Sequence, residues 1–173
     1  MGDPHAPVTL VEYADLQCPY CAEWTLETLP VIVSDYVRTG RVRIVFRGLA
    51  FLGSDSELAL RAVIAAGAQN RLWDLVDELY QRQGYENNGW VGEELPAAVA
   101  AVPGLELQRL QRLGRRAATD RAMIRASRAA QTAGVQGTPS FELGRTGGPL
   151  RLIRLRSLGT EGIRPALEAA LRR

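Results

Sequence analysis

Fourteen residues decide the fold: residues 8–21 read Val-Thr-Leu-Val-Glu-Tyr-Ala-Asp-Leu-Gln-Cys-Pro-Tyr-Cys. Val8–Tyr13 is apolar at nearly every position, which is typical of a strand that is covered on both faces. Asp15-Leu16-Gln17 forms a turn, and Pro19 then occupies the first position of a helix, where its missing N–H costs nothing. The two cysteines, Cys18 and Cys21, are therefore expected one turn apart at the start of a helix.

Apolar residues at helical spacing continue this helix as far as Val37, and Gly40 ends it. Pro30 lies inside the helical run, so it predicts a kink. Apolar and polar residues alternate from Arg41 to Phe46, which indicates a second strand.

The next 80 or so residues are helical in pattern, and two strands and a helix follow them. The helices are expected at 57–68, 72–80, 94–102, 106–114 and 119–133, with a loop at 84–92. Strands are expected at 140–143 and 150–155, joined by the Gly- and Pro-containing hairpin segment 144–149. Thr160 is expected to cap a final helix that ends near Leu171.

The order of elements is thus strand, helix, strand, helical block, strand, strand, helix. Without the helical block, this order resembles the thioredoxin fold, an α/β fold of the β-α-β plus β-β-α type. The resemblance implies a discontinuous thioredoxin-like domain at 1–53 and 135–173, and an inserted all-helical subdomain at 54–134. The chain length of 173 residues is compatible with this single domain and its insertion.

Composition excludes several kinds of chemistry. All 21 basic residues are arginine, so Schiff-base chemistry through a lysine is excluded. The single histidine, His5, leaves no material for a serine–histidine–aspartate triad or a multi-histidine metal site. No apolar run reaches the length of a membrane span. The first residues lack a secretory signal, which leaves two locations open: the cytoplasm, or the cell envelope after removal of an export segment or anchor.

The Cys18–Cys21 pair has three interpretations. A structural zinc site needs four ligands, and this chain would have to recruit His5 and a carboxylate. A purely structural disulfide would close a minimal loop, so it would contribute little stability. The remaining interpretation is a redox-active dithiol, which needs no metal and no bound cofactor.

A redox dithiol needs a stabilised thiolate, and the start of a helix supplies unpaired N–H groups for it. Cys18, at the expected N-cap, is predicted to be an exposed nucleophile whose pKa is lowered by the N–H groups near Tyr20 and Cys21. Cys21, one turn into the helix and covered, is predicted to resolve the mixed disulfide. Pro19 stiffens the turn, and Tyr20 carries no charge, so Tyr20 cannot lower the pKa of Cys18 as a histidinium would. The thiolate stabilised by the helix start favours the reduced form of the pair, so we expect a potential in the oxidising half of the known range, about −270 to −120 mV.

Glu12 lies six positions before Cys18, on a strand expected to be buried. A buried carboxylate is costly unless it has a task or a partner. Either Glu12 accepts the proton of Cys21, with a pKa raised by burial, or it lies at a sheet edge and pairs with an arginine. Asp15 is expected to cap N–H groups of the turn.

Thr138-Pro139 precedes the third expected strand, where a thioredoxin-type order places a cis-proline facing the dithiol. The bent peptide would leave the Thr138 backbone free to pair with an extended substrate segment. Pro139 presents no N–H beside the sulfurs.

With these motifs and the helical insertion, the chain resembles the DsbA-like thiol–disulfide oxidoreductases over about residues 3–171. Further motifs that carry the resemblance are Ala6–Thr9, Asp15–Cys21, Gln69–Trp73 and Gly137–Pro139. The resemblance implies an exported enzyme that oxidises reduced or unfolded proteins and is reoxidised by a membrane partner of the DsbB or VKOR type. It also implies Cys18 as nucleophile, Cys21 as resolving thiol, Glu12 as buried acid and Pro139 as cis-proline. Substrate contacts are expected from Thr138, Pro19 and Tyr20. Tyr20 replaces the histidine of the best-known members.

Other functions stay open at this point. Glutaredoxins, which are glutathione-linked reductases, also carry Cys-Pro-Tyr-Cys, but they are about half this length. A disulfide isomerase of the DsbC or DsbG type would usually carry an N-terminal dimerisation module, whereas we expect a monomer. Seven arginines could form a basic face, but nearby acids and the net charge of +2 favour a solvated surface, so we expect no nucleic-acid partner. They are Arg109, Arg112, Arg115, Arg116, Arg121, Arg125 and Arg128. Trp90, in the expected loop, either packs in the core or borders a peptide-binding surface.

Overall fold

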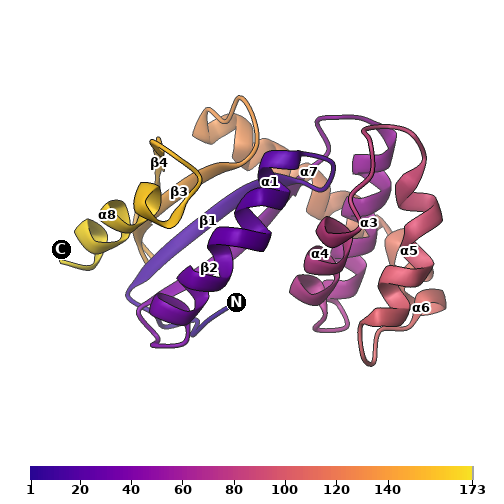
Figure 1. Ribbon diagram of the computed structural model, residues 1–173, viewed down its shortest axis with the longest axis horizontal. Coiled ribbons are helices and arrows are strands. Elements are labelled where there is room, and N and C mark those ends of the chain that lie inside the picture. Colours follow the sequence, from indigo (N-terminus) through magenta and orange to yellow (C-terminus); the bar gives the residue numbers. More distant parts are fainter. Residues whose placement is uncertain (173) are drawn as a thin grey trace.

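A four-stranded sheet in the order β2-β1-β3-β4 lies at the centre of the computed structural model, which describes residues 1–172 (Figure 1). Strand β1 runs parallel to β2 and antiparallel to β3, and β4 pairs antiparallel with β3. The strands are β1 Val8–Asp15, β2 Val42–Leu49, β3 Ser140–Arg145 and β4 Arg151–Ile153. This is the thioredoxin-like α/β fold that the element order predicts.

Helices connect and surround these strands. The segment between β1 and β2 is α1 Pro19–Glu23, the π-helical η1 Trp24–Thr28, α2 Leu29–Ile32 and the π-helical η2 Val33–Val37. Between β2 and β3 lie α3 Ser54–Gly67, α4 Leu72–Gln81, α5 Trp90–Ala101, α6 Leu107–Gly114 and α7 Ala117–Ala133, and the chain ends with α8 Thr160–Leu171. All five expected helices of the insertion are therefore present.

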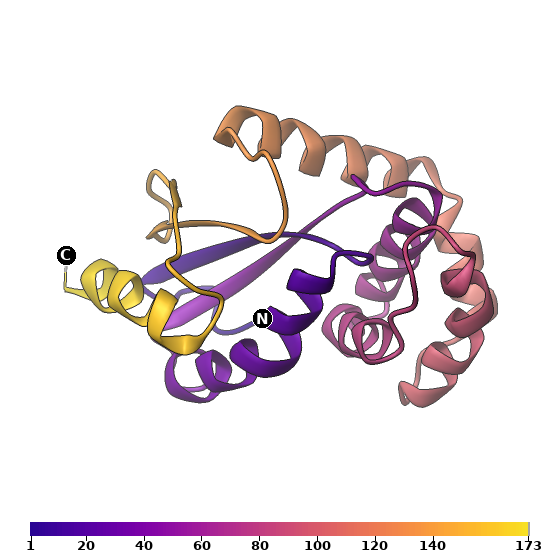
Figure 2. The same cartoon turned by 45° about the horizontal axis from the view of Figure 1, so that its top comes forward.

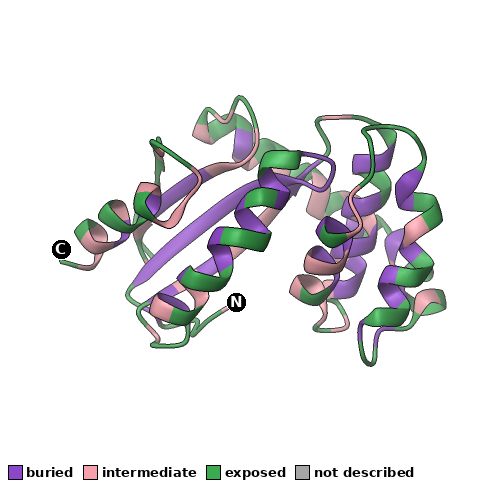
Figure 3. Ribbon diagram, viewed as in Figure 1, coloured by how far each residue is buried: buried purple, intermediate pink, exposed green. Residues whose placement is uncertain are grey.

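Both faces of the sheet are covered (Figure 2). The α1–η2 segment and α8 cover one face, where Leu10 and Phe141 pack with Trp24 and Ile163. Helix α7 covers the other face, where its alanines pack against Val11 and other apolar residues of β1 and β2. Strand β1 is buried along its whole length as a result (Figure 3). The expectation of a strand covered on both faces is confirmed.

Helices α3–α6 pack at the end of the sheet where β1 and β2 finish (Figure 1). Their apolar residues form one cluster that also contains Leu16, Cys18 and Cys21. The helical block therefore packs directly against the Cys-Pro-Tyr-Cys turn. The division of the chain at residues 54 and 134 stays a prediction, because α7 contacts both α3 and β2.

Several boundaries differ from the sequence prediction. The turns around Pro30 are π-helical and not simply kinked: the N–H of Leu29 bonds to the carbonyl of Trp24, five residues earlier. Helix α5 begins at Trp90, inside the expected loop. Gly159, not Thr160, is the N-cap of α8, and no side chain caps that helix. The last two differences arise at helix ends, where local propensity is weakest and packing decides.

Candidate active site

Cys18 is the N-cap residue of α1, with extended backbone angles (φ −75°, ψ 119°) and Pro19 following in the first turn. The N–H of Cys18 donates to the Asp15 carbonyl at 3.0 Å, and the Cys18 carbonyl accepts from Cys21 N–H at 3.1 Å. The sulfur thus lies at the N-terminus of a helix, as the proline spacing predicts. Both cysteines are free thiols.

The pKa of the Cys18 thiol is lowered from 9.0 to about 6. The largest cause is a hydrogen bond from the Cys21 side chain, followed by Thr138 and the backbone N–H groups of Cys21 and Tyr20, while burial acts in the opposite direction. The lowered pKa was expected, but its order of causes was not, because the backbone N–H groups contribute less than the partner thiol. At neutral pH Cys18 is therefore mainly the nucleophilic thiolate.

The predicted exposure of Cys18 is wrong. The residue is only 6% exposed, against 0% for Cys21. In its protonated form the thiol donates a hydrogen bond to the Thr138 carbonyl at 3.2 Å, and the apolar cluster of the helical block packs beside it. Only the difference in burial between the two sulfurs was predictable. Thr138 and the helical block, which cover Cys18, are both distant from it in sequence.

Cys21 is fully buried, and burial raises the pKa of its thiol well above 9.0. The neighbouring Cys18 side chain and the charge of Glu12 raise it further. The two sulfurs therefore have opposite properties: one is ionised near neutral pH and the other holds its proton. This asymmetry matches the predicted roles of nucleophile and resolving thiol, which stay predictions.

Glu12 lies on β1, one of the two inner strands, and is fully buried, so the alternative of an edge position paired with an arginine is wrong. Its strand partners are Phe46 on β2 and Phe141 on β3, and neither carboxyl oxygen has a hydrogen-bond partner within residues 1–172. Burial raises the pKa of Glu12 from 4.5 to about 8. The group can therefore exchange a proton near neutral pH, within the electrostatic range of Cys21.

The peptide bond between Thr138 and Pro139 is cis, and the Thr138 carbonyl contacts the Cys18 sulfur. Thr138 and Pro139 are half-buried and directly precede β3. A hollow of about 500 Å³ opens beside them, lined by Gly137, Pro139, Phe141, Leu152, Arg154 and Leu158 among others. Tyr20, which is 61% exposed, and the exposed Pro19 complete the surface around the dithiol.

Asp15 does more than cap the turn. Its buried carboxylate accepts hydrogen bonds from Gln17 N–H (2.9 Å), the Ser56 hydroxyl (2.6 Å) and the N–H groups of Phe51 (2.7 Å) and Leu52 (3.1 Å). The carboxylate therefore connects the turn before Cys18 to the segment between β2 and α3.

Three amide side chains at the site were missed from the sequence. The Gln17 amide donates to Asn87 at 3.1 Å, and Asn87 N–H donates back at 2.7 Å. Gln83 donates to the carbonyls of Leu16 (2.8 Å) and Cys18 (3.3 Å). The only available signal was the position of Gln17 beside the motif, since Asn87 lies 70 residues from Gln17 and Gln83 lies 65 residues from Cys18.

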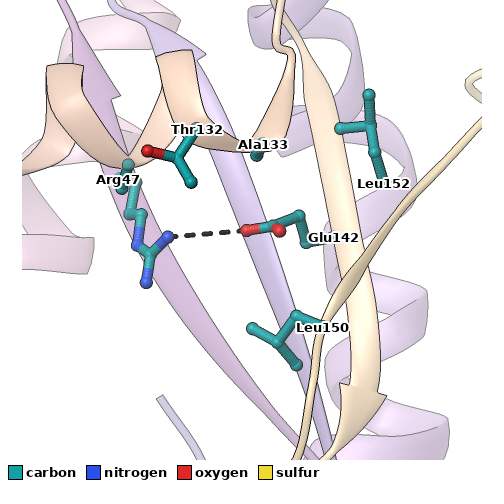
Figure 4. A pocket seen from close by; sticks show the side chains of 7 residues that line it. Arg47, Thr132, Ala133, Glu142, Leu150 and Leu152 are labelled. Atoms are coloured by element: carbon teal, nitrogen blue, oxygen red, sulfur yellow. Dashed lines mark hydrogen bonds and ion pairs between the residues drawn. The ribbon is translucent and has the colours of Figure 1, made fainter.

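A second hollow, of about 520 Å³, lies under α7 on the sheet face opposite Glu12 and the dithiol (Figure 4). There, Arg47 donates to the Tyr13 hydroxyl at 2.6 Å and forms an ion pair of 3.5 Å with Glu142, which also accepts from Tyr13 at 2.7 Å. These groups satisfy one another, and the sheet separates them from the sulfurs. They connect strands β1, β2 and β3 on the sheet face that α7 covers.

Other residues singled out in the sequence lie away from the dithiol surface. Trp90 is only 4% exposed, so it packs in the core and does not border a peptide-binding surface. The seven arginines on α6, α7 and the segment between them are all exposed. Within residues 1–172, no group of three or more histidine, cysteine or acidic side chains is arranged to hold a metal ion. No helix of that same range is both long and apolar enough to cross a membrane.

Comparisons with known proteins agree with this geometry. The family model described as Thioredoxin matches residues 1–146, so the chain belongs to the thioredoxin family. The probable disulfide bond formation protein D of Bacillus anthracis is 31% identical over 144 residues, which are 81% of this chain and 66% of that protein. The chain spans about two thirds of the length of this curated relative and of its Bacillus cereus counterpart.

Solved structures share the fold. Oxidised BdbD of Bacillus subtilis superimposes with a TM-score of 0.86 at 22% identity, covering 100% of this chain and 92% of that one. Wolbachia pipientis α-DsbA1 gives a TM-score of 0.83 at 18% identity, covering 99% and 89%. These structures show that the chain has the fold of DsbA proteins. Within the thioredoxin family, the match to the disulfide bond formation proteins supports the class of protein-disulfide oxidoreductases.

Proposed function

We propose that this protein acts as a thiol–disulfide oxidase, which transfers the Cys18–Cys21 disulfide to reduced or unfolded protein substrates. The observation that carries the proposal is the lowered pKa of Cys18, about 6, beside a buried partner whose pKa is raised. A stable thiolate favours the reduced form of the pair, so the disulfide form oxidises other thiols.

The reaction proceeds by two exchanges at sulfur. A substrate thiolate attacks Cys18 Sγ, the S–S bond breaks, and Cys21 leaves with the bonding electrons as a thiolate, which takes the proton of Glu12. A second substrate thiolate then attacks the substrate sulfur of the mixed disulfide, and Cys18 leaves as a thiolate. The substrate loses two electrons and the enzyme gains them. If no second thiolate arrives, Cys21 attacks Cys18 and releases the substrate unchanged.

Substrate binding takes place at the surface around the dithiol. An extended substrate segment pairs with the Thr138 backbone and enters the hollow beside Pro139, whose lining is partly apolar. Tyr20 and Pro19 contact the segment from the other side, since both are exposed next to Cys18. No cofactor is needed, because the cysteines themselves carry the electrons.

The oxidase works outside the cytoplasm, in the periplasm or cell envelope of a bacterium, as a monomer without a nucleic-acid partner. A membrane protein of the DsbB or VKOR type reoxidises the pair by taking its two electrons to a quinone. The DsbA-like family supports this proposal. Disulfides form and persist in oxidising compartments such as the periplasm, so a disulfide-forming enzyme is expected to work there.

The reduction potential tests the direction of electron flow. Equilibration with glutathione buffers is expected to give a value in the oxidising half of the range of about −270 to −120 mV. A value near −270 mV would overturn the oxidase and indicate a reductase. Faster reshuffling of a scrambled substrate than net oxidation of a reduced one would indicate an isomerase.

Trapping experiments test the two cysteine roles. Cys21→Ser is expected to accumulate mixed disulfides at Cys18 when it is mixed with a disulfide-bonded substrate, because the resolving thiol is absent. Cys18→Ser, the matched control, is expected to trap none. Mass-spectrometric peptide mapping locates the crosslink, and a bond to Cys21 in the Cys18→Ser variant would contradict the assignment.

A further inference from the structure

Trp24 lies three residues after Cys21, on the buried side of the same helical segment. The residue is 0% exposed, and its ring packs on Phe141 with centroids 4.5 Å apart. Its indole N–H has no hydrogen-bond partner among the described residues. A buried N–H without a partner is costly, so its presence calls for a physical explanation.

Glu12 supplies the missing acceptor. Phe141, on which the indole packs, is the strand partner of Glu12 in the β1–β3 register, so both groups lie over the same face of the sheet. Both carboxyl oxygens of Glu12 are also buried and unpaired. The indole N–H lies close enough to oppose the burial that raises the pKa of Glu12.

Few other groups compete for this carboxyl. The titratable groups whose charges interact with Glu12 are Cys21 on α1 and Tyr80 on α4; Tyr80 is buried, and its pKa is raised well above 10. Within residues 1–172 Glu12 has no ion pair. An indole N–H is a permanent donor, because it does not titrate in the pH range of the enzyme.

We propose that Trp24 is the positioning residue for Glu12: its indole N–H donates a hydrogen bond to one carboxylate oxygen and leaves the other directed at Cys21. This inference rests on the proposed role of Glu12 in proton transfer. When the disulfide opens, the proton moves from Glu12 to the Cys21 thiolate, and the negative charge that remains on Glu12 is stabilised by the indole. When the disulfide forms again, Glu12 takes the proton back.

The first test is the pH titration of the Trp24 indole ¹H–¹⁵N resonance in the oxidised protein, where the Cys18–Cys21 disulfide removes both titrating thiols. The resonance is expected to shift with a midpoint near the pKa of Glu12, about 8. The shift is expected to vanish in Glu12→Gln. The Trp90 indole, which is also buried and unpaired but belongs to the helical cluster, is the internal control and should stay unchanged.

The second test removes the donor. Trp24→Phe keeps an aromatic ring against Phe141 and is expected to raise the Glu12 midpoint, followed through its ¹³C carboxyl resonance, by about one to two pH units. The pH profile of Cys18–Cys21 disulfide opening by a small thiol should move upward by the same amount. Thr25→Val removes the neighbouring buried hydroxyl, also unpaired, and serves as the matched control that leaves the midpoint in place.

Two outcomes would overturn the inference: a Trp24 indole that does not titrate near pH 8 in the oxidised wild type, or a Glu12 midpoint that is unchanged in Trp24→Phe. If Trp24→Phe fails to fold, the comparison of wild type with Glu12→Gln still decides. These resonances do not depend on substrate. If the Trp24 indole titrates as expected but the reduction potential is reducing, the oxidase proposal is wrong and the hydrogen bond between Trp24 and Glu12 is still supported.

Discussion

The acidity of Cys18 depends on a single neighbouring side chain more than on its helix. The hydrogen bond from Cys21 is the largest cause of the lowered pKa, and the N–H groups of Tyr20 and Cys21 add smaller contributions. The helix N-terminus and the buried partner therefore act on the same sulfur, so the spacing of two residues between the cysteines supplies both effects.

Because the Cys21 side chain lowers the pKa of Cys18 more than the backbone N–H groups do, two substitutions of Cys21 should change this pKa differently. Cys21→Ala removes the donor, so the pKa of Cys18 should move from about 6 well toward its ordinary value of 9.0. Cys21→Ser keeps an O–H donor at the same position, so the pKa should stay closer to the wild-type value. Rates of alkylation by iodoacetamide as a function of pH give the midpoints. Equal midpoints in both variants would show that the backbone N–H groups dominate after all.

At the scale of single residues, the sequence predicts only those features that neighbouring residues determine. Pro19 after Cys18 fixes the helix start, so the N-cap position and the order of burial of the two sulfurs follow from neighbouring residues alone. The contacts of Cys18 with Thr138 span 120 residues, and those of Trp24 with Phe141 depend on how η1 packs on β3. No local pattern in the sequence encodes either contact.

At the scale of elements, the turn between β1 and α1 is held by segments from elsewhere in the chain. Asp15 binds the segment after β2, and the Gln17 amide pairs with Asn87 in the loop before α5. Gln83, just after α4, binds the Cys18 carbonyl. The helical block therefore helps to fix the position of the nucleophile in addition to covering it.

Asp15→Ala is predicted to be strongly destabilising. It leaves the N–H groups of Gln17, Phe51 and Leu52 without their acceptor, and unpaired buried donors cost about 1–3 kcal/mol each before relaxation. We expect a loss of about 3 kcal/mol or more in the free energy of unfolding, measured by urea denaturation.

Asp77→Ala is the control for that substitution, because the hydrogen bond of Asp77 to Gln81 is solvent-exposed. It should change the free energy of unfolding by no more than about 0.5 kcal/mol. Comparable losses in the two variants would mean that water enters the turn and replaces the acceptor.

Whether a segment is a helix or a strand was predictable along most of the chain, because the apolar periodicity is strong there. The residues at which the helices and strands begin and end were not predictable. Trp90 shows the reason. Its side chain is drawn into the core beside Gly84, where its Cβ and ring atoms leave no room for a larger residue, and the helix accordingly begins inside a stretch rich in glycine and asparagine. Packing overrides the local preference for a loop at that point.

For the whole molecule, one buried carboxyl links chemistry to stability. Folding raises the pKa of Glu12 from 4.5 to about 8, so the folded state binds a proton that the unfolded state releases between these pH values. Stability therefore falls as the pH rises from about 4.5 to about 8, and the loss is complete above pH 8. Proton transfer near neutral pH is thus obtained at the expense of stability in the same pH range.

Glu12→Gln should remove that dependence. A glutamine has nearly the same shape as the protonated acid, so the variant and the wild type should have similar stability near pH 4. As the pH rises, the wild type loses stability and the variant does not, because glutamine has no proton to lose. The variant should therefore exceed the wild type in free energy of unfolding by as much as about 5 kcal/mol at pH 9. Urea denaturation of the oxidised proteins at pH 4, 7 and 9 measures the difference without interference from the thiols. Glu27→Gln changes an exposed residue and is the control: its curve of stability against pH should run parallel to that of the wild type. A parallel curve for Glu12→Gln would mean that Glu12 is not protonated in the folded protein at pH 7.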